Sequence, residues 1–490
     1  MKRISRRRLL RQLGTIAGAS ALSRFSVSLA QPGSTEMCFM SAGELAALLR
    51  RGDISSVELT QYFIDRIENY DQILNAVVVR DFERALEAAT VADRALARGE
   101  LLGPFHGLPM TIKESYDIAG LATTWGIPQA ANNIAEADAV VVQRLKNAGA
   151  HFLGKTNVPI NLGDFQSYNA IYGTTNNPWD TTRTPGGSSG GSAAALAAGL
   201  TGLESGSDIG GSIRNPAHFC GVYGHKPTLG IIPTRGQQPP GVPVSPQHPD
   251  LSVVGPMARS AEDLATALEV VAGPDILDSP GWRLDLPEPR MNSLDQLRIA
   301  IWPDDPNSPV ASEVANRVQE IAELLSNLGA TVSDTARPSF AATMSHETYM
   351  PILGALMGLP GSDLQLRDYL GLHGRRGFLR TQWQEFFNDW DVLICPTTAT
   401  PAFIQDQSDP ATRTLLVNDL SQPYYQQVFW AGLATVSYLP STVFPTGLSA
   451  GGLPIGLQAI GAEFNDRTTI EFARLMAQEI GGFQPPSGYI

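Results

Sequence analysis

The sequence predicts an α/β protein built as one large domain. Helical and strand patterns alternate along most of the 490 residues, which is the order typical of helices packed on a sheet. The composition, 43% hydrophobic and 17% charged, supplies ample material for a buried core. No linker rich in Pro, Gly or Ser without motif-like content divides the chain, so one domain is the simplest interpretation.

Two amphipathic helices are expected first, because Ser41 with Glu44 and Ser55 with Glu58 each form a capping box at a helix start. A strand, a helix and a second strand are then predicted for LPMTIKES, AVVVQRLKNAGA and HFLGKTN. The same alternation continues in six later segments, at residues 260–273, 297–302, 313–330, 391–398, 453–461 and 467–481.

Residues 335–390 have the least regular pattern of the chain. Two interpretations are open for them: a cap that faces the substrate, and a peripheral helical insertion without function.

Residues 1–30 differ from the rest and predict an export signal. Six of the first twelve residues are Lys or Arg, a short and weakly apolar region follows, and SLA at 28–30 fits a small-residue cleavage site. SRRRLL at 5–10 matches the twin-arginine pattern. An ordinary secretory signal or a basic surface helix is the alternative. We therefore expect residues 31–490 to be the mature domain, in the periplasm or secreted.

The charge balance argues against nucleic acid as a partner. Residues 1–30 carry seven Lys or Arg and no Asp or Glu, so their removal changes the formal net charge from −13 to −20. Phosphate backbones are bound through clustered cations, and the mature chain has no basic stripe. No apolar run reaches the roughly 20 residues that a membrane-spanning helix requires, so no membrane segment is expected after signal removal.

The segment TPGGSSGGSAAALAAG at 184–199 predicts an ordered turn that leads into a helix. A Gly/Ser run is usually a flexible linker, but here strong helix formers follow at once. Glycines let backbones approach closely, and a Gly/Ser turn at a helix N-terminus can direct hydroxyl and N–H groups to one point. The pattern is therefore typical of a functional site.

Two known loop types fit this segment poorly. A phosphate-binding loop ends in Gly-Lys-Ser/Thr, whereas this chain has Gly190, Gly191 and Ser192 without a lysine. The Gly-x-Ser-x-Gly pattern of a nucleophile elbow occurs at 186–190 and 187–191, but an elbow follows an apolar strand. The preceding YGTTNNPWDTTRTP consists of turn-forming residues instead.

A second glycine–serine cluster, ESGSDIGGSIRNPAHFCGVYGHKPT, occupies residues 204–228. Residues 208–212 again place a serine at a glycine turn after a short strand. The presence of two such turns indicates that both contribute to one functional site.

Together with IKES around Lys113, the two clusters resemble the amidase signature family of serine hydrolases. Lys113, Ser188 and Ser212 stand 75 and 24 residues apart, which is the spacing of that family's lysine, cis-serine and nucleophilic serine. The resemblance is tightest over a signature core at about 107–228, and weaker segments extend it over nearly all of 31–490. It implies the family fold, a mixed β-sheet covered by helices on both faces.

The resemblance implies that Ser212 is the nucleophile, Ser188 the bridging serine on a cis peptide bond and Lys113 the base. A serine hydroxyl is a weak nucleophile at neutral pH, so an adjacent group must take its proton. A lysine whose pKa is lowered by burial can do so through the second serine.

Further positions match the family around these three. The backbone N–H groups of Ile209, Gly210, Gly211 and Ser212 are expected to form the oxyanion hole. Three supporting residues are expected to hold the two turns by hydrogen bonding without touching the substrate, namely Ser189, Asp208 and Arg214.

Each of these residues also has a simple structural interpretation. Taken one at a time, Ser188 and Ser212 could each cap a helix, and Lys113 could be a surface charge. Asp208 and Arg214 could form a surface ion pair. Their combination at the family spacing favours the catalytic interpretation.

Cysteines and histidines indicate no metal site. Cys38, Cys220 and Cys395 are widely spaced, so we expect buried free thiols. One disulfide bond is the alternative if the protein is outside the cytoplasm. His218 and His225 lie near the expected site in sequence, but no His/Cys/Asp cluster has metal-ligand spacing. We interpret both histidines as structural.

One segment departs from the family pattern. Many members have a Glu-Asn pair ahead of the NPWD stretch, where this chain has Tyr168 and Asn169. The substrate therefore does not follow from the resemblance, because the family shares its fold and its Ser–Ser–Lys set across many amides. An exported enzyme is not expected to be the tRNA amidotransferase subunit, whose partners are cytoplasmic.

The resulting hypothesis is an exported amidase without cofactor or metal. It hydrolyses a linear C–N bond of a small-molecule or peptide amide through an acyl-enzyme on Ser212 and releases ammonia or an amine. Two alternatives stay open: an esterase or other acyl transferase with the same residues, and a catalytically silent periplasmic binding protein.

Overall fold

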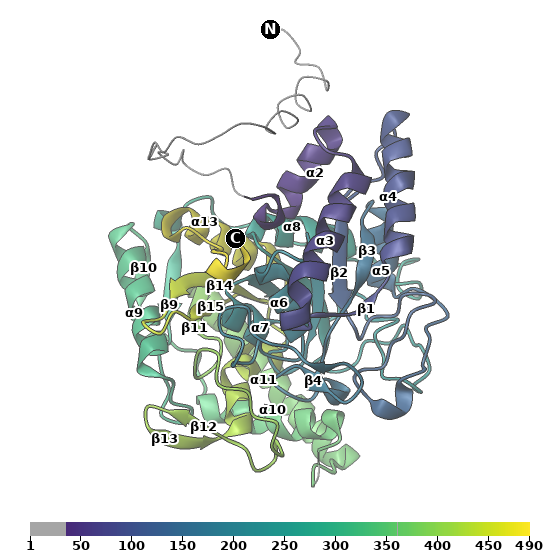
Figure 1. Cartoon of the computed structure of the whole chain (residues 1–490). Helices are drawn as coiled ribbons and strands as arrows, with labels where there is room; N and C mark the ends of the chain where they lie inside the picture. Colours follow the sequence, from purple (N-terminus) through teal and green to yellow (C-terminus); the bar gives the residue numbers. More distant parts are fainter. Residues whose placement is uncertain (1–35, 360) are drawn as a thin grey trace, which may run out of the picture. The chain divides into compact units, whose positions relative to one another are not determined.

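Residues 36–359 and 361–490 are described by the computed structural model (Figure 1). The export signal expected at 1–30 lies outside these residues. Glu36–Ile490 form one compact unit, which agrees with the single large domain that the sequence predicts. None of the helices in this part of the chain combines the length and the apolar character needed to cross a bilayer.

Both predicted capping boxes are present at the start of the described chain. At α2 (Ala42–Arg51), Ser41 Oγ accepts from the Glu44 N–H at 3.1 Å, and the Glu44 carboxylate accepts from the Ser41 N–H at 2.8 Å. Ser55 and Glu58 make the same pair of bonds at α3 (Ser56–Leu74). The serine–glutamate spacing therefore predicted both helix starts correctly.

The predicted alternation of helix and strand is confirmed. The further helices of the described part are α4 (Phe82–Ala97), α5 (Val140–Asn147), α6 (Gly190–Ala197), α7 (Arg214–Cys220), α8 (Ala261–Val271), α9 (Ser312–Asn327), α10 (Ala342–Met357), α11 (Leu366–Asp389), α12 (Val428–Thr435) and α13 (Asp466–Ile480).

A large mixed sheet forms the centre of the described residues, with strand order β10-β9-β11-β15-β14-β7-β8-β6. The β10/β9 and β9/β11 pairs are parallel and the others are antiparallel. Its strands are β6 (Glu204–Asp208), β7 (Tyr223–Lys226), β8 (Val253–Ala258), β9 (Arg298–Ile301), β10 (Thr331–Ser333), β11 (Val392–Pro396), β14 (Ser441–Leu448) and β15 (Pro454–Ile460). Figure 1 shows β9, β10 and α9 on one side, away from α2, α3 and α4.

Helices cover both faces of this sheet, as the sequence led us to expect. Alternate residues of β9 and β11 point to opposite faces. Ile299 and Ile394 pack in the cluster that includes residues of α8, α9 and α13. Ala300 and Leu393 pack with residues of α11 and α12, while α6 and α7 pack against β8 and β14. The core therefore lies in two layers.

The strands predicted at 108–115 and 151–157 lie outside the main sheet. They form β2 (Pro109–Lys113) and β3 (His151–Thr156), which pair in parallel within a smaller sheet that includes β1 (Val77–Arg80). Two hydrogen bonds join β2 to β6 and the residues just before it: the Thr111 N–H donates to Thr201 Oγ1 at 2.8 Å, and Thr111 Oγ1 donates to Glu204 Oε1 at 2.5 Å. This polar junction holds Lys113 beside the strand that leads to Ser212.

Two short ladders complete the described strands. They are β4 (Tyr168–Asn169) with β5 (Gly173–Thr174), and β12 (Thr414–Val417) with β13 (Leu420–Pro423).

Candidate active site

The two glycine–serine segments meet at the N-terminal ends of α6 and α7. The Ser189 N–H donates to the Ser212 carbonyl at 3.1 Å, and the Gly187–Ser188 peptide bond is cis, as the resemblance implied. A Cβ at Gly187 would lie 2.3 Å from the Asp164 carbonyl oxygen. The first segment is therefore an ordered turn, and its glycines permit a close approach of backbones.

Lys113 ends β2 and is completely buried. Its Nζ donates to Ser188 Oγ at 2.6 Å and to Ser207 Oγ at 3.0 Å. Burial lowers the pKa of Lys113 from its ordinary 10.5 to about 7, while the charges of Asp208 and Glu204 act in the opposite direction. A substantial fraction of the amine is therefore neutral at pH 7 and able to accept a proton.

Ser188 and Ser212 line the same cavity. Ser188 is 1% exposed and Ser212 is 7% exposed, so both residues are buried and Ser212 is slightly the more exposed. Among the described residues, no hydrogen bond joins the two hydroxyls. The direct contact in this structure is that of Lys113 with Ser188.

The turn that ends at Ser212 presents backbone donors. Three of its N–H groups, those of Ile209, Gly210 and Ser212, have no hydrogen-bond acceptor within the described part of the chain. The Gly211 N–H differs from the expectation, because it donates to Asp208 Oδ1 at 2.9 Å. Gly211 has a φ of 106°, a conformation that glycine adopts without strain.

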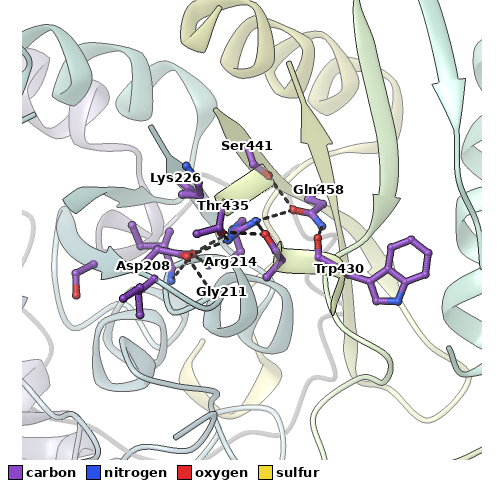
Figure 2. A network of polar contacts seen from close by, with 12 residues as sticks. Asp208, Gly211, Arg214, Lys226, Trp430, Thr435, Ser441 and Gln458 are labelled. Atoms are coloured by element: carbon purple, nitrogen blue, oxygen red, sulfur yellow. Dashed lines mark hydrogen bonds and ion pairs between the residues drawn. The ribbon is translucent and has the colours of Figure 1, made fainter. Parts of the chain in front are cut away.

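Asp208 and Arg214 form a buried ion pair behind this turn (Figure 2). Arg214 Nε and Nη2 donate to the carboxylate at 3.0 and 2.9 Å. Burial alone would raise the pKa of Asp208, but Arg214 holds it at about 2. The alternative interpretation of Asp208 and Arg214 as a surface ion pair is therefore wrong, because neither side chain is exposed.

Arg214 also ties the turn to the C-terminal part of the chain. It donates to Gln458 Oε1 at 3.1 Å, to Thr435 Oγ1 at 2.8 Å and to the Ala431 carbonyl at 3.0 Å. Figure 2 shows the arginine between Asp208 on one side and Gln458 on the other. Because each donor of a buried guanidinium needs a partner, these bonds define the orientation of Arg214 and of the turn.

The structure brings the residues that the sequence singled out to one place. Lys113, Ser188, Ser189, Asp208, Arg214 and the turn 209–212 lie together. Ser207 was missed as a partner of Lys113, although it stands next to Asp208 in the second cluster.

Lys226 and Glu204 were also missed, as buried charges near the site. Burial lowers the pKa of Lys226 to about 7 and raises that of Glu204 to about 7. Sequence spacing contains no signal for either.

The two histidines near the site are structural, as interpreted. His218 Nδ1 accepts from the Gly456 N–H at 2.7 Å and its Nε2 lies 3.0 Å from the Thr400 carbonyl. His225 contacts Thr442 and Asp466.

The three cysteines are buried free thiols. Within residues 36–359 and 361–490, no cluster of three or more His, Cys, Asp or Glu side chains is arranged to hold a metal ion.

The cavity at Ser212 has two arms. The wide arm has a volume of about 340 Å³ and is lined largely by residues of the loop 237–252. The narrow arm has a volume of about 50 Å³ and is mainly apolar. It is lined by Leu162, Gly163, Asp164, Phe165, Ile209, Gly210, Ser212, Met350, Leu353, Met357, Leu359, Tyr425 and Val428.

The region 335–390 contributes directly to this cavity. It contains α10 and α11, and α10 provides Met350, Leu353 and Met357 to the narrow arm. Leu356 and Met357 also line the wide arm. Of the two interpretations left open by the sequence, the structure supports the substrate-facing cap for α10.

The fold and the site define the class of protein, an α/β protein in which a buried lysine hydrogen-bonds to a serine that lines a cavity. The family model for amidases matches residues 58–359 and 351–470. The chain belongs to the amidase family, known as the amidase signature enzymes, and is an amidase.

Similar proteins of this family have different names and sources. The chain is 34% identical to the indoleacetamide hydrolase of Bradyrhizobium diazoefficiens, over 90% of this chain and 86% of that protein. It is also 34% identical to a glutamyl-tRNA(Gln) amidotransferase subunit from Moorella thermoacetica, over 90% and 97%. A solved bacterial aryl acylamidase of the amidase signature family has a TM-score of 0.78 at 25% identity, with 92% and 97% of the two chains covered.

Proposed function

We propose that the chain hydrolyses a linear carboxylic amide through an acyl-enzyme on Ser212, with Lys113 as base and Ser188 as proton relay. The contact that carries this proposal is the 2.6 Å hydrogen bond between Lys113 Nζ and Ser188 Oγ. It places a lysine of lowered pKa one hydroxyl away from the cavity that contains Ser212.

The reaction then has two halves. The Ser212 proton passes through Ser188 to neutral Lys113 while Ser212 Oγ bonds to the carbonyl carbon. The tetrahedral intermediate collapses as the C–N bond breaks and the amine leaves with a proton returned from Lys113. Water, activated by the same base, attacks the acyl ester and releases the carboxylic acid and Ser212.

The free N–H groups of Ile209, Gly210 and Ser212 serve as the oxyanion hole. Hydrogen-bond donors directed at the developing negative charge often make the largest single contribution to transition-state stabilisation in acyl transfer. Gly211 has a different role in this proposal, because its N–H holds Asp208 and thereby shapes the turn.

The substrate is a neutral amide with an apolar group in the narrow arm. The acidic side chains that line the two arms are already paired: Asp164 with Arg413 at 2.9 Å and Asp250 with Arg376 at 2.9 Å. Burial lowers the pKa of His248 in the wide arm and favours its neutral form. A charged substrate would have no free counter-charge at these positions. The name of the indoleacetamide hydrolase fits this class of amide.

Labelling with a fluorophosphonate tests the nucleophile. We expect stoichiometric labelling of the mature wild-type chain, no labelling of Ser212→Ala, and normal labelling of Ser326→Ala, a control on α9 remote from the cavity. Full labelling of Ser212→Ala would refute the role of Ser212, and an unlabelled wild-type chain would favour the silent binding protein. Hydrolysis of a matched amide and ester pair then ranks amidase against esterase.

Export by the twin-arginine route is part of the same proposal. It is based on the basic start, the SRRRLL pattern and the SLA site within residues 1–30. An enzyme outside the cytoplasm acts as a free-standing hydrolase there, without tRNA.

A further inference from the structure

Tyr349 on α10 reaches the oxyanion turn from a part of the chain that contributes none of the proposed catalytic residues. Its side chain is completely buried, and its hydroxyl donates to the Ile209 carbonyl at 2.6 Å. The next residue, Met350, lines the narrow arm. The same helix therefore contacts both the substrate cavity and the backbone of the turn.

The carbonyl of Ile209 and the N–H of Gly210 belong to one peptide group. A peptide group is planar, and in the trans form its C=O and N–H point in opposite directions. A hydrogen bond that holds the carbonyl therefore also determines where the N–H points. Gly210 has no side chain to resist rotation of this group, so the orientation depends on outside contacts.

The surroundings of Tyr349 hold its hydroxyl in place and keep it protonated. A Cβ at Gly432 of α12 would lie 2.7 Å from Cδ1 of the tyrosine ring, so the ring packs directly on that helix. Burial and the charge of Asp208 raise the pKa of the hydroxyl far above its ordinary 10, against the opposite influence of Arg214 and Thr435. The hydroxyl thus remains a donor at every pH at which the enzyme works.

We propose that Tyr349 is a positioning residue that locks the Ile209–Gly210 peptide, so that the Gly210 N–H is directed at the oxyanion. The inference rests on the proposed function, since it assigns a cause to the geometry of that oxyanion hole. It also links the apolar cap helix to the chemistry, because movement of α10 would release the peptide.

The test is Tyr349→Phe, which removes the hydroxyl and keeps the ring. Loss of one oxyanion donor commonly lowers the rate by roughly 10²–10³, so we expect loss of its orientation to lower kcat by about 10- to 100-fold with KM within about twofold. The affinity for a boronic acid that forms a tetrahedral adduct should fall by a similar factor. Binding of the product carboxylate should change little.

Tyr116→Phe is the matched control. Tyr116 is also completely buried, and its hydroxyl donates to the Gly206 carbonyl at the same 2.6 Å, but that carbonyl lies in β6 and outside the oxyanion turn. We expect a comparable loss of thermal stability without the selective loss of boronic acid affinity. Equal effects in both variants would overturn the inference.

A second variant covers the case in which Tyr349→Phe fails to fold. Gly432→Ala keeps the hydroxyl but displaces the ring, so it should show the same selective fall in kcat. Wild-type kcat and boronic acid affinity in either folded variant would refute the role of Tyr349. A failure of the proposed function would appear separately, as turnover that persists in Ser212→Ala.

Discussion

The lowered pKa of Lys113 affects both the stability of the fold and the reactivity of the site. Because its pKa falls from 10.5 to about 7 in the folded chain, the unfolded chain binds more protons between these two pH values. The contribution of this residue to stability therefore increases as pH rises from about 7 to 10.5. The same shift makes the amine available as a base near neutral pH.

Glu204 is placed to tune this lysine. It accepts from Thr111, two residues before Lys113 on β2, and its negative charge raises the pKa of Lys113. Of the other charged groups nearby, Asp208 acts in the same direction on Lys113 and is itself paired with Arg214, while Lys226 faces that pair. Glu204 is therefore the carboxylate whose removal most simply tests the coupling.

Glu204→Gln should shift the pH dependence of the reaction. In the wild type we expect kcat/KM to rise as Lys113 loses its proton, with a midpoint near pH 7. In Glu204→Gln the midpoint should move to lower pH by less than about 1 unit, because the amide lacks the negative charge that Glu204, with its pKa raised to about 7, carries in part over this range. A pH profile of kcat/KM measures this shift.

Glu262→Gln on α8 serves as a control for the change of net charge and should leave the midpoint in place. An unchanged midpoint in Glu204→Gln would contradict the coupling. A midpoint that moves to higher pH would mean that Glu204 lowers the pKa of Lys113, the opposite of the effect proposed here.

At the scale of elements, α10 links the cavity to the oxyanion turn. The helix joins the apolar lining of the narrow arm, through Met350 and Leu353, to the oxyanion turn through Tyr349. Sequence patterns could not separate this cap from a peripheral insertion, because residues 335–390 have no regular apolar periodicity that would show which face of a helix is buried. The hydrogen bond between Tyr349 and Ile209 joins residues 140 positions apart in the chain. It is visible only in the folded structure, and it distinguishes the cap from a peripheral insertion.

Leu353→Trp should fill the narrow arm. With only about 50 Å³ available there, the larger ring removes the space for an apolar group. We expect kcat/KM for an aryl or long-chain amide to fall by at least about 10-fold, and that for acetamide to change much less, since discrimination in apolar pockets is about 1–3 kcal/mol per group.

Leu366→Trp, at an exposed position of α11, is the control and should leave both substrates unaffected. Equal losses for both amides in Leu353→Trp would mean that the narrow arm does not bind the apolar group.

At the scale of the whole molecule, the site is assembled from both ends of the domain. Arg214 follows the nucleophile turn and bonds to α12 and to β15, while Lys113 comes from the small sheet near the N-terminal side. The site exists only after these parts have packed together.

Replacement of Arg6 and Arg7 by Lys should retain the chain in the cytoplasm. The change keeps the positive charge but removes the arginine pair that the twin-arginine pattern requires. In a bacterium with that route, activity should move from the periplasmic to the cytoplasmic fraction, measured by assay of both fractions.

Arg24→Lys, outside the pattern, should be exported normally. Undiminished periplasmic activity of the Arg6, Arg7 variant would instead favour an ordinary secretory signal.

Local patterns in the sequence predicted the parts of this enzyme that depend on neighbouring residues. The capping boxes of α2 and α3, the helix–strand alternation and the two glycine turns all follow from short-range geometry. The spacing of Lys113, Ser188 and Ser212 identified the family. These features were readable because they are encoded by adjacent or regularly spaced residues.

Tertiary structure alone decided the chemistry of those residues. The lowered pKa of Lys113, the engagement of the Gly211 N–H by Asp208 and the contact of Tyr349 with the turn all arise from chain segments that meet only in the fold. Burial and long-range contacts depend on the path of the whole chain, which a short sequence window does not contain. The sequence therefore determined which groups are present, and packing determined which of them are neutral, oriented and open to a substrate.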